Sequence, residues 1–274
     1  MPNHHVQSNL FTTPPSSQFE PSIPRQVPIQ QLSESGINSL IQTALIPPKA
    51  RVTWKGQIQS SLDGKVSHAF KQVLEQMKAY PDVLVVDFNW TNFATFFNHD
   101  SWGMIGNLHP HNCVKDRRQN LQQLLLQPYN TAQRTILEQA LTINALNSYR
   151  LSIRNAMLEK LVEVAKDYRV VVTETLDVET LHQAACKQTV IKDLGWLNLL
   201  EDFKGLLEDQ GTELVLLERM YKSLTCPNCQ HSSRENRNGN SFYCLRCGFG
   251  GLPDFMAGMN MWTDWLSRAK TNQF

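Results

Sequence analysis

Four cysteines near the end of this 274-residue chain are arranged as two Cys-x-x-Cys pairs, Cys226 with Cys229 and Cys244 with Cys247. Two such pairs can supply four thiolates to one tetrahedral zinc ion. Their separation is just below the usual window for a zinc ribbon, but a short hairpin can close that distance. Two disulfides or four unrelated buried thiols are the alternatives. The spacing predicts a structural Zn²⁺ held by these cysteines in a ribbon over residues 226–251.

Three carboxylates fall at the ends of predicted elements. Asp87 is near the end of an apolar strand over 82–88, Glu174 ends another over 169–174, and Asp254 starts the last helix. If the two strands are neighbours in one sheet, their acids share an edge, and the helix can bring Asp254 there. Three carboxylates without a cation repel one another, whereas Mg²⁺ or Mn²⁺ takes carboxylate oxygens. Two such ions roughly 4 Å apart can hydrolyse a phosphodiester.

Each acid also has structural interpretations that need no metal. For Asp87 there are few such interpretations, because its neighbours Leu84 to Val86 and Phe88 are apolar. Glu174 could be a solvated acid at a strand end. Asp254 follows a proline and could simply cap the last helix. The acids alone therefore leave both a metal site and separate structural roles open.

The elements that must position these residues follow from the apolar pattern. Strands are predicted over 51–58, 82–88, 93–98, 102–108, 169–174 and 213–217. Helices are predicted over 65–79, within 114–168, from Trp196 to Gly211, and from Asp254 to about Ser267. A three-strand meander followed by alternating helix and strand is the arrangement of an RNase H-like fold. The predicted class is α/β, with a mixed sheet, helices and an inserted zinc ribbon. Fold alone licenses no function.

The predicted domain organisation has four parts. Residues 1–35 are rich in Pro, Ser, Gln and Asn and predict a disordered arm. Residues 36–80 predict a short divergent segment that packs on the main domain. Residues 81–225 and 252–270 form the predicted RNase H-like domain. Residues 226–251 are the ribbon inserted into it.

Composition narrows the class of protein. The net charge is only +1, so a basic groove for nucleic acid would need local clustering. The chain has neither a secretion signal nor an apolar run long enough to cross a membrane, which favours a cytoplasmic, nucleoid-associated protein. Cys113 and Cys186 are interpreted as small buried side chains. His109 to Cys113 is interpreted as a loop rather than a metal cluster.

Basic side chains in the helical region are either a solvated surface or contacts to phosphates, and the pattern leaves both open. They are Lys115, Arg117, Arg118, Arg134, Arg150 and Arg154.

Together, these motifs resemble the C-terminal half of TnpB-type (OrfB) transposon-encoded nucleases and the related compact type V CRISPR effectors. Residues 86–95 resemble the first RuvC motif of that family, and 172–178 resemble the second. Residues 225–249 resemble its zinc ribbon, and Asp254 to Ala257 stand where it has the third acidic motif. The similarity spans about residues 82–262.

The resemblance implies that a guide RNA selects a DNA target and that a RuvC-like site cuts it. Asp87, Glu174 and Asp254 would be catalytic acids that bind Mg²⁺ or Mn²⁺. The zinc ribbon would lie beside the nucleic acid. DNA, a guide RNA and a second protein chain in place of the absent N-terminal half are the partners expected, and no membrane is.

Three departures from the family pattern qualify this expectation. Asn89 stands where a glycine is usual, Met256 stands where an asparagine is usual, and residues 1–80 do not resemble the family's N-terminal half. A metal-dependent nuclease is favoured. A binding module without catalysis, or the remnant of a mobile element, is the alternative. In the binding module, phosphates would be contacted by Arg234, Arg237 and Arg246.

Overall fold

The computed structural model describes residues 35, 36, 39, 46–62, 65–89, 92–175, 196–218 and 222–271. The chain divides into two compact units, Met1–Thr43 and Ala44–Phe274. All the elements named below belong to the second unit. Residues 1–34 of the predicted disordered arm and Cys186 lie outside the described residues.

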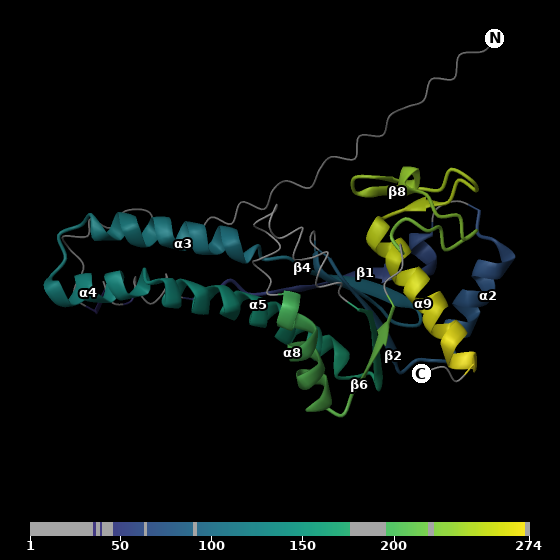
Figure 1. Ribbon diagram of the computed structural model, residues 1–274, viewed down its shortest axis with the longest axis horizontal. Helices are drawn as coiled ribbons and strands as arrows, with labels where there is room; N and C mark the ends of the chain where they lie inside the picture. Colours follow the sequence, from purple (N-terminus) through teal and green to yellow (C-terminus); the bar gives the residue numbers. More distant parts are fainter. Residues whose placement is uncertain are drawn as a thin grey trace, which may run out of the picture. The chain divides into compact units, whose positions relative to one another are not determined.

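A six-stranded mixed sheet, in the order β1-β4-β3-β2-β5-β6, forms the centre of the second unit (Figure 1). The strands are β1 (Val52–Gln57), β2 (Val83–Phe88), β3 (Asn92–Phe97), β4 (Ser101–Gly106), β5 (Val170–Glu174) and β6 (Glu213–Leu217). β2, β3 and β4 form an antiparallel meander, and β1 extends it beyond β4. β5 pairs parallel with β2, and β6 pairs parallel with β5. This is an RNase H-like strand order with one added edge strand, and it confirms the predicted fold class.

Helices cover both faces of the sheet. They are α2 (His68–Met77), α3 (Pro110–Leu125), α4 (Thr131–Ala140), α5 (Ile143–Ala165), α8 (Trp196–Glu208) and α9 (Pro253–Thr271). Alternate residues of β2 separate the two cores: Val83 and Val85 pack with α2 and α9, whereas Leu84, Val86 and Phe88 pack with α5 and α8. Figure 1 shows α9 and α8 on opposite sides of the sheet. Because both faces are covered, β2 is buried along its whole length.

The close packing of α9 on the sheet depends on a glycine. A Cβ added at Gly258 would lie 2.1 Å from a ring carbon of Phe97 on β3. No side chain fits in that space, so the helix backbone itself approaches the strand. This contact lies one turn after Asp254 and helps to set where the start of α9 meets the sheet.

The sequence interpretation was wrong about the start of α3. His109 to Cys113 was expected to form a loop, but the helix begins at Pro110. Proline is favoured in the first turn of a helix because the N–H that it lacks has no partner there anyway. His109 precedes it with a left-handed φ of 49°.

Two of the basic side chains assigned to the surface or to phosphates are buried instead. Arg117 lies over the ring of Tyr149, with its guanidinium carbon 4.0 Å from the ring centroid. Arg154 forms an ion pair with Asp202 of α8. Both connect helices, so neither is available to bind a nucleic-acid backbone.

The zinc ribbon is a small sheet between β6 and α9. Its strands are β7 (Arg237–Asn238), β8 (Ser241–Tyr243) and β9 (Gly250–Gly251), and the 3-10 turn η3 (Arg234–Asn236) precedes them. A second 3-10 turn, η2 (Gln59–Ser61), follows β1. Within the described part of the chain, no helix is long and apolar enough to cross a membrane.

Candidate functional site: a thiol cluster and an acidic site

The four ribbon cysteines form a compact cluster. The Sγ atoms of Cys226 and Cys247 are 3.6 Å apart, and those of Cys229 and Cys244 are 3.5 Å apart. All four sulfur atoms lie within 4.8 Å of one another. Four thiolates around a zinc ion at about 2.3 Å would lie about 3.8 Å apart. The donor set and its spacing therefore fit a tetrahedral zinc ion, and the distances are too long for disulfides.

The environment of the cluster favours a bound cation. Burial raises the pKa of the Cys226 thiol. Burial also acts to raise the pKa of Cys247, but hydrogen bonds from the Phe249 N–H and the Asn228 side chain, among others, lower it to about 7. Zinc binds the thiolate form and makes deprotonation of all four groups favourable. Without the ion, the four sulfur atoms would form only weak hydrogen bonds with one another.

Hydrogen bonds fix the ribbon to the rest of the unit. The backbone N–H of Ser67, the N-cap residue of α2, donates to Asn228 Oδ1 at 2.6 Å, and the Ser67 hydroxyl donates to the Asn228 carbonyl at 2.8 Å. On α9, the Asn260 side chain donates to the carbonyls of Lys222 and Thr225 at 2.7 and 2.8 Å. Phe249 packs edge-on against Phe70. The ribbon is thus part of the core.

The second feature is the acidic site, formed by Asp87, Glu174 and Asp254. Side chains alternate along a strand, so Asp87 points to the same face of the sheet as Val83 and Val85, the face covered by α9. On β5, Glu174 follows the same alternation after Val170 and Val172, which pack in that core. The parallel register pairs Val85 with Val172. Continued by two residues, it places Asp87 and Glu174 at the same level of the sheet.

Asp254 joins this level from the first turn of α9. Its Oδ2 accepts a hydrogen bond of 3.1 Å from the side chain of Asn92, which starts β3. The backbone N–H of Asn92 in turn donates to Asn89 Oδ1 at 2.9 Å. Asn92 thus links Asp254 to Asn89, the residue that follows the strand carrying Asp87.

The pKa of Asp87 reflects its burial and the charges of the other two acids. Burial raises its pKa well above the usual value, and the charges of Glu174 and Asp254 raise it further. A side-chain hydrogen bond from Asn89 and the charge of Lys222 oppose the shift. Burial also raises the pKa of Asp254, against the hydrogen bond from Asn92 and the charge of Arg237. Asp87 is only 7% exposed, so its ionised form needs a nearby cation.

The donor set of the acidic site fits Mg²⁺ or Mn²⁺. All three ligands offer carboxylate oxygens, the donors that these ions prefer. Among the described residues, only the four cysteines bring three or more ligand atoms within 4.8 Å of one another, so the acids are spaced more widely than the thiols.

The three ribbon arginines predicted to contact nucleic acid differ in their relation to the acids. Arg234 lies in η3, Arg237 lies in β7, and all three side chains, including that of Arg246, are exposed. Arg237 donates to the Ser223 hydroxyl at 3.2 Å, and its charge acts on Asp254. Of the three, Arg237 is the one whose charge lowers the pKa of Asp254.

Sequence reasoning missed two residues that act on the acids: Lys222, whose charge lowers the pKa of Asp87, and Asn92, which donates a hydrogen bond to Asp254. Lys222 is a single lysine between β6 and the ribbon, and nothing in its neighbourhood signals a role. Asn92 lies within the first acidic motif, five residues after Asp87, and that position could have drawn attention to it. Asn89 was noted only as a departure from a usual glycine, yet its side chain is a hydrogen-bond partner of Asp87.

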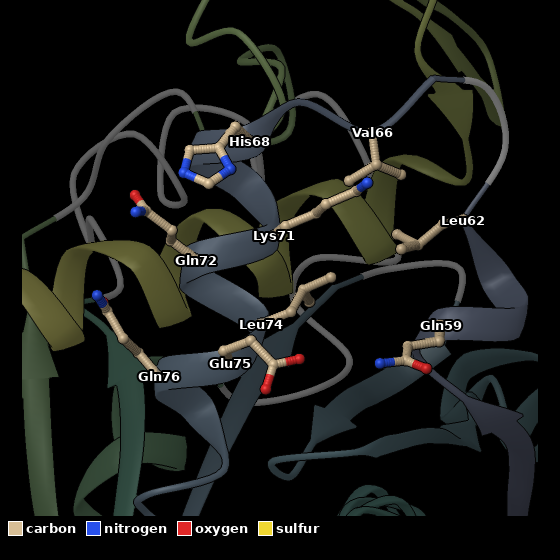
Figure 2. A pocket seen from close by; sticks show the side chains of 9 residues that line it. All are labelled: Gln59, Leu62, Val66, His68, Lys71, Gln72, Leu74, Glu75 and Gln76. Atoms are coloured by element: carbon tan, nitrogen blue, oxygen red, sulfur yellow. The ribbon is translucent and has the colours of Figure 1, made fainter.

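A groove of about 610 Å³ lies away from both clusters, along α2. Figure 2 shows side chains of α2, among them His68, Gln72 and Gln76, on one side of the groove and Gln59 and Leu62 on the other. None of the three acids and none of the four cysteines lines it. The groove is thus separate from the candidate chemistry.

No protein-family model and no curated protein matches the sequence. Among solved structures, the chain is similar to a Cas12f1–sgRNA–target DNA complex, with a TM-score of 0.47 and 14% identity over 65% of this chain and 48% of that chain. It is similar to the mini-RNA-guided endonuclease CRISPR-Cas_phi3, with a TM-score of 0.44 and 15% identity over 72% and 47% of the two chains. A CRISPR-Cas12f ternary complex gives 0.46 and 17% over 65% and 38%. The chain matches less than half of each of these proteins.

Proposed function

We propose that the protein binds DNA and hydrolyses its phosphodiester bonds with two Mg²⁺ or Mn²⁺ ions at the acidic site. The observation that carries the proposal is the buried carboxylate of Asp87, which Glu174 from β5 and Asp254 from α9 surround with like charge. Such an arrangement destabilises a protein unless cations neutralise it. It is therefore more readily explained as a metal site than as a structural feature.

The residues would have the following roles. Asp87, the most buried of the three acids, would hold the ions together with Glu174 and Asp254. The ions would supply an activated water and stabilise the leaving oxygen. Asn92 would keep Asp254 oriented through its 3.1 Å hydrogen bond. Arg237 would hold the phosphate backbone beside Asp254, and Arg234 and Arg246 would extend the contact along the ribbon.

The test is Mg²⁺-dependent cleavage of labelled single-stranded DNA by the wild type and by Asp87→Asn, which keeps the shape and removes the charge. We expect the variant to lose at least about a hundredfold in rate, because a charged metal ligand is gone. Asp82→Asn is the matched control: this aspartate lies at the start of the same strand but pairs with Arg169 on the surface. Equal cleavage by wild type and Asp87→Asn would remove the catalytic assignment.

A non-cleaving nucleic-acid-binding protein is the second candidate, and the exposed arginines of the ribbon favour it. Binding that weakens steeply with salt, without cleavage and without dependence on Asp87, would support this alternative. Arg237→Gln should then weaken binding and reduce its salt dependence by about one counterion.

The motif resemblance extends the proposal to partners and origin: a TnpB-type transposon-derived protein that acts with a guide RNA and with a second chain. Purification from cells followed by sequencing of co-purified RNA would test the first partner. A discrete RNA species that restores or directs cleavage supports it. Full activity of nuclease-treated, RNA-free protein would contradict it.

A further inference from the structure

The outer face of the ribbon sheet carries exposed hydrophobic side chains. Along β8 and the residues that follow it, Phe242 and Cys244 are buried, whereas Tyr243 and Leu245 are 59% and 58% exposed. Side chains alternate along an extended chain, so the two exposed residues lie together on the side that points away from the core. This side of the ribbon is therefore open to solvent.

The strand β9 continues this face towards the acidic site. Gly250 of β9 pairs with Tyr243, and Leu252, two residues further on, is 46% exposed. Two residues later, Asp254 lies in the first turn of α9. Figure 1 shows β8 at this end of α9, and the two elements are in contact. The exposed face thus ends two residues before one of the three acids.

Tyr243 rests on the backbone of the ribbon. A Cβ added at Gly248 would lie 3.3 Å from the Tyr243 hydroxyl oxygen, and one added at Gly250 would lie 3.6 Å from a carbon of its ring. The two glycines therefore leave room for the side chain to lie against the main chain. The turn beneath it is fixed, because the N–H of Gly248 donates to the Cys244 carbonyl at 2.9 Å. One side of the ring is supported, and the rest of it faces solvent.

The surroundings of this face fit a polyanion better than a protein. A specific protein partner contacts about 20–30 residues on each side, whereas this face presents three large hydrophobic side chains. A nucleobase needs only one ring to stack on, and the phosphates beside it would meet positive charge. The charged side chains between Cys226 and Gly251 are all exposed, and all but one are arginines: Arg234, Arg237 and Arg246, with Glu235.

We propose that Tyr243 is a stacking platform for an unpaired base, and that the outer face of the ribbon leads single-stranded DNA towards the acidic site. The inference deepens the proposed function and rests on it for the choice of DNA. Bases in a duplex stack on one another and offer no free face, whereas an unpaired base can stack on an aromatic ring. The platform therefore selects single-stranded over double-stranded DNA.

The test compares Tyr243→Phe with Tyr243→Leu. Both variants keep a hydrophobic side chain over the two glycines, but only phenylalanine keeps an aromatic ring. The probe is a single-stranded DNA that carries 2-aminopurine, whose fluorescence falls when the base stacks. It is titrated without added Mg²⁺ or Mn²⁺ and without chelator, so that zinc stays bound. We expect Tyr243→Leu to bind about tenfold more weakly with less quenching, and Tyr243→Phe to bind within about twofold of the wild type.

A tyrosine that only covers the glycines gives a different result. An aromatic ring opposite a strand glycine can stabilise a sheet without any ligand. In that case Tyr243→Leu would unfold at lower denaturant concentration and bind single-stranded DNA like the wild type, which would overturn the inference. Trp54→Leu is the matched control, because this tryptophan is 51% exposed on the edge strand β1. It should leave binding unchanged, and an equal loss there would also contradict a specific platform.

The salt dependence of binding separates the base from the phosphates. Tyr243→Leu should leave the slope of log Kd against log salt concentration unchanged, because a stacked base releases no counterion. Arg246→Gln should lower that slope by about 0.7, the value for one phosphate of a single strand. A slope that fell with Tyr243→Leu would assign the tyrosine to the backbone instead.

Duplex DNA and single-stranded RNA of the same sequence complete the test. Tyr243→Leu should bind the duplex like the wild type, and a loss confined to RNA would overturn the choice of DNA. Mg²⁺-dependent cleavage is measured separately on the same proteins. Cleavage with no effect of Tyr243→Leu on binding would overturn the platform alone. Binding that depends on Tyr243 in a protein that does not cleave would overturn the catalytic proposal alone.

Discussion

The thiol cluster and the acidic site are built in opposite ways. The four cysteines lie within one short hairpin region, and their sulfur atoms are within 4.8 Å of one another. The three acids come from β2, β5 and α9 and are more widely spaced. A closed set of four soft ligands fits an ion that stays. Carboxylates from three separate elements are hard ligands of the kind that Mg²⁺ and Mn²⁺ prefer. The comparison therefore separates a compact set of four thiols from a set of acids that only the fold can bring together.

The largest effect is expected at the thiol cluster. Cys244→Ser removes one of two fully buried ligands, and zinc binding to such sites contributes on the order of 10 kcal/mol. We expect the zinc-to-protein ratio to fall from one to near zero and cooperative unfolding to be lost, as followed by metal analysis and circular dichroism. Cys113→Ser, outside the cluster on α3, should retain both. Zinc-free wild type with unchanged stability would contradict a structural role for the metal.

Gly258→Ala should come next, and it should affect the acidic site more than the thiol cluster. The added methyl group would meet the ring of Phe97 at 2.1 Å, and overpacking of this kind costs about 1–3 kcal/mol. As α9 shifts, Asp254 should move away from Asp87, so Mn²⁺ affinity should fall while zinc content stays at one.

The matched control for Gly258→Ala is Gly205→Ala on α8. No atom lies within 4 Å of its added Cβ, so the better helix propensity of alanine should stabilise the protein by up to about 1 kcal/mol. If Gly258→Ala and Gly205→Ala changed stability in the same direction, the close approach of α9 to β3 would not explain the effect of Gly258→Ala.

A smaller effect, which depends on pH, is expected from Asp87. Its pKa is raised in the folded protein, so its contribution to stability is complete below the unfolded pKa of about 4 and is lost as pH rises through the folded value. In buffer free of divalent ions, Asp87→Asn should therefore exceed the wild type in stability by about 1 kcal/mol or more near pH 8. The difference should shrink towards pH 5. Saturating Mn²⁺ should reverse the order, because only the wild type binds it tightly.

The smallest effect is expected from Asp82→Asn. Asp82 Oδ2 lies 2.7 Å from Arg169 Nε, but the arginine side chain is 75% exposed, and surface pairs contribute little. The hydrogen bond from Arg169 lowers the pKa of Asp82, so its small contribution is present above about pH 4 and lost below it. The sign is opposite to that of Asp87. Chemical denaturation of Asp82→Asn and Asp87→Asn at pH 3 and pH 7 would test whether the two pH dependences of stability have opposite signs.

The sequence predicted the features whose signal is local. The central strands β2 and β5 each begin with an apolar run that does not alternate, which marks burial on both faces. β2, β5 and β6 lie within one residue of their predicted positions. The cysteine spacing located the thiol cluster, because all four ligands come from one short stretch. The start of α3 was missed because a proline beside two histidines was interpreted as a loop. The proline is the first residue of the helix instead.

The sequence did not predict the roles of residues that depend on contacts with distant parts of the chain. Arginine is usually a surface residue, but Arg117 and Arg154 are buried, the first against Tyr149 of α5 and the second against Asp202 of α8. No local sequence pattern reveals this burial. Asp254 could have been only a helix cap. Its hydrogen bond to Asn92 and its effect on Asp87 depend on where α9 crosses the sheet, and Gly258 sets that crossing by letting the backbone approach Phe97.

The sequence by itself therefore determined the α/β class, the order of strands and helices along the chain, and the ligands of the thiol cluster, because each follows from periodicity or from spacing along the chain. Only the tertiary structure decided that β5 pairs with β2 in a register that aligns Glu174 with Asp87, and that the charge of Asp254 on α9 acts on Asp87. The physical reason is that charges act through space. Their effect on one another depends on distance and burial in the folded protein, and neither quantity is encoded in the order of residues alone.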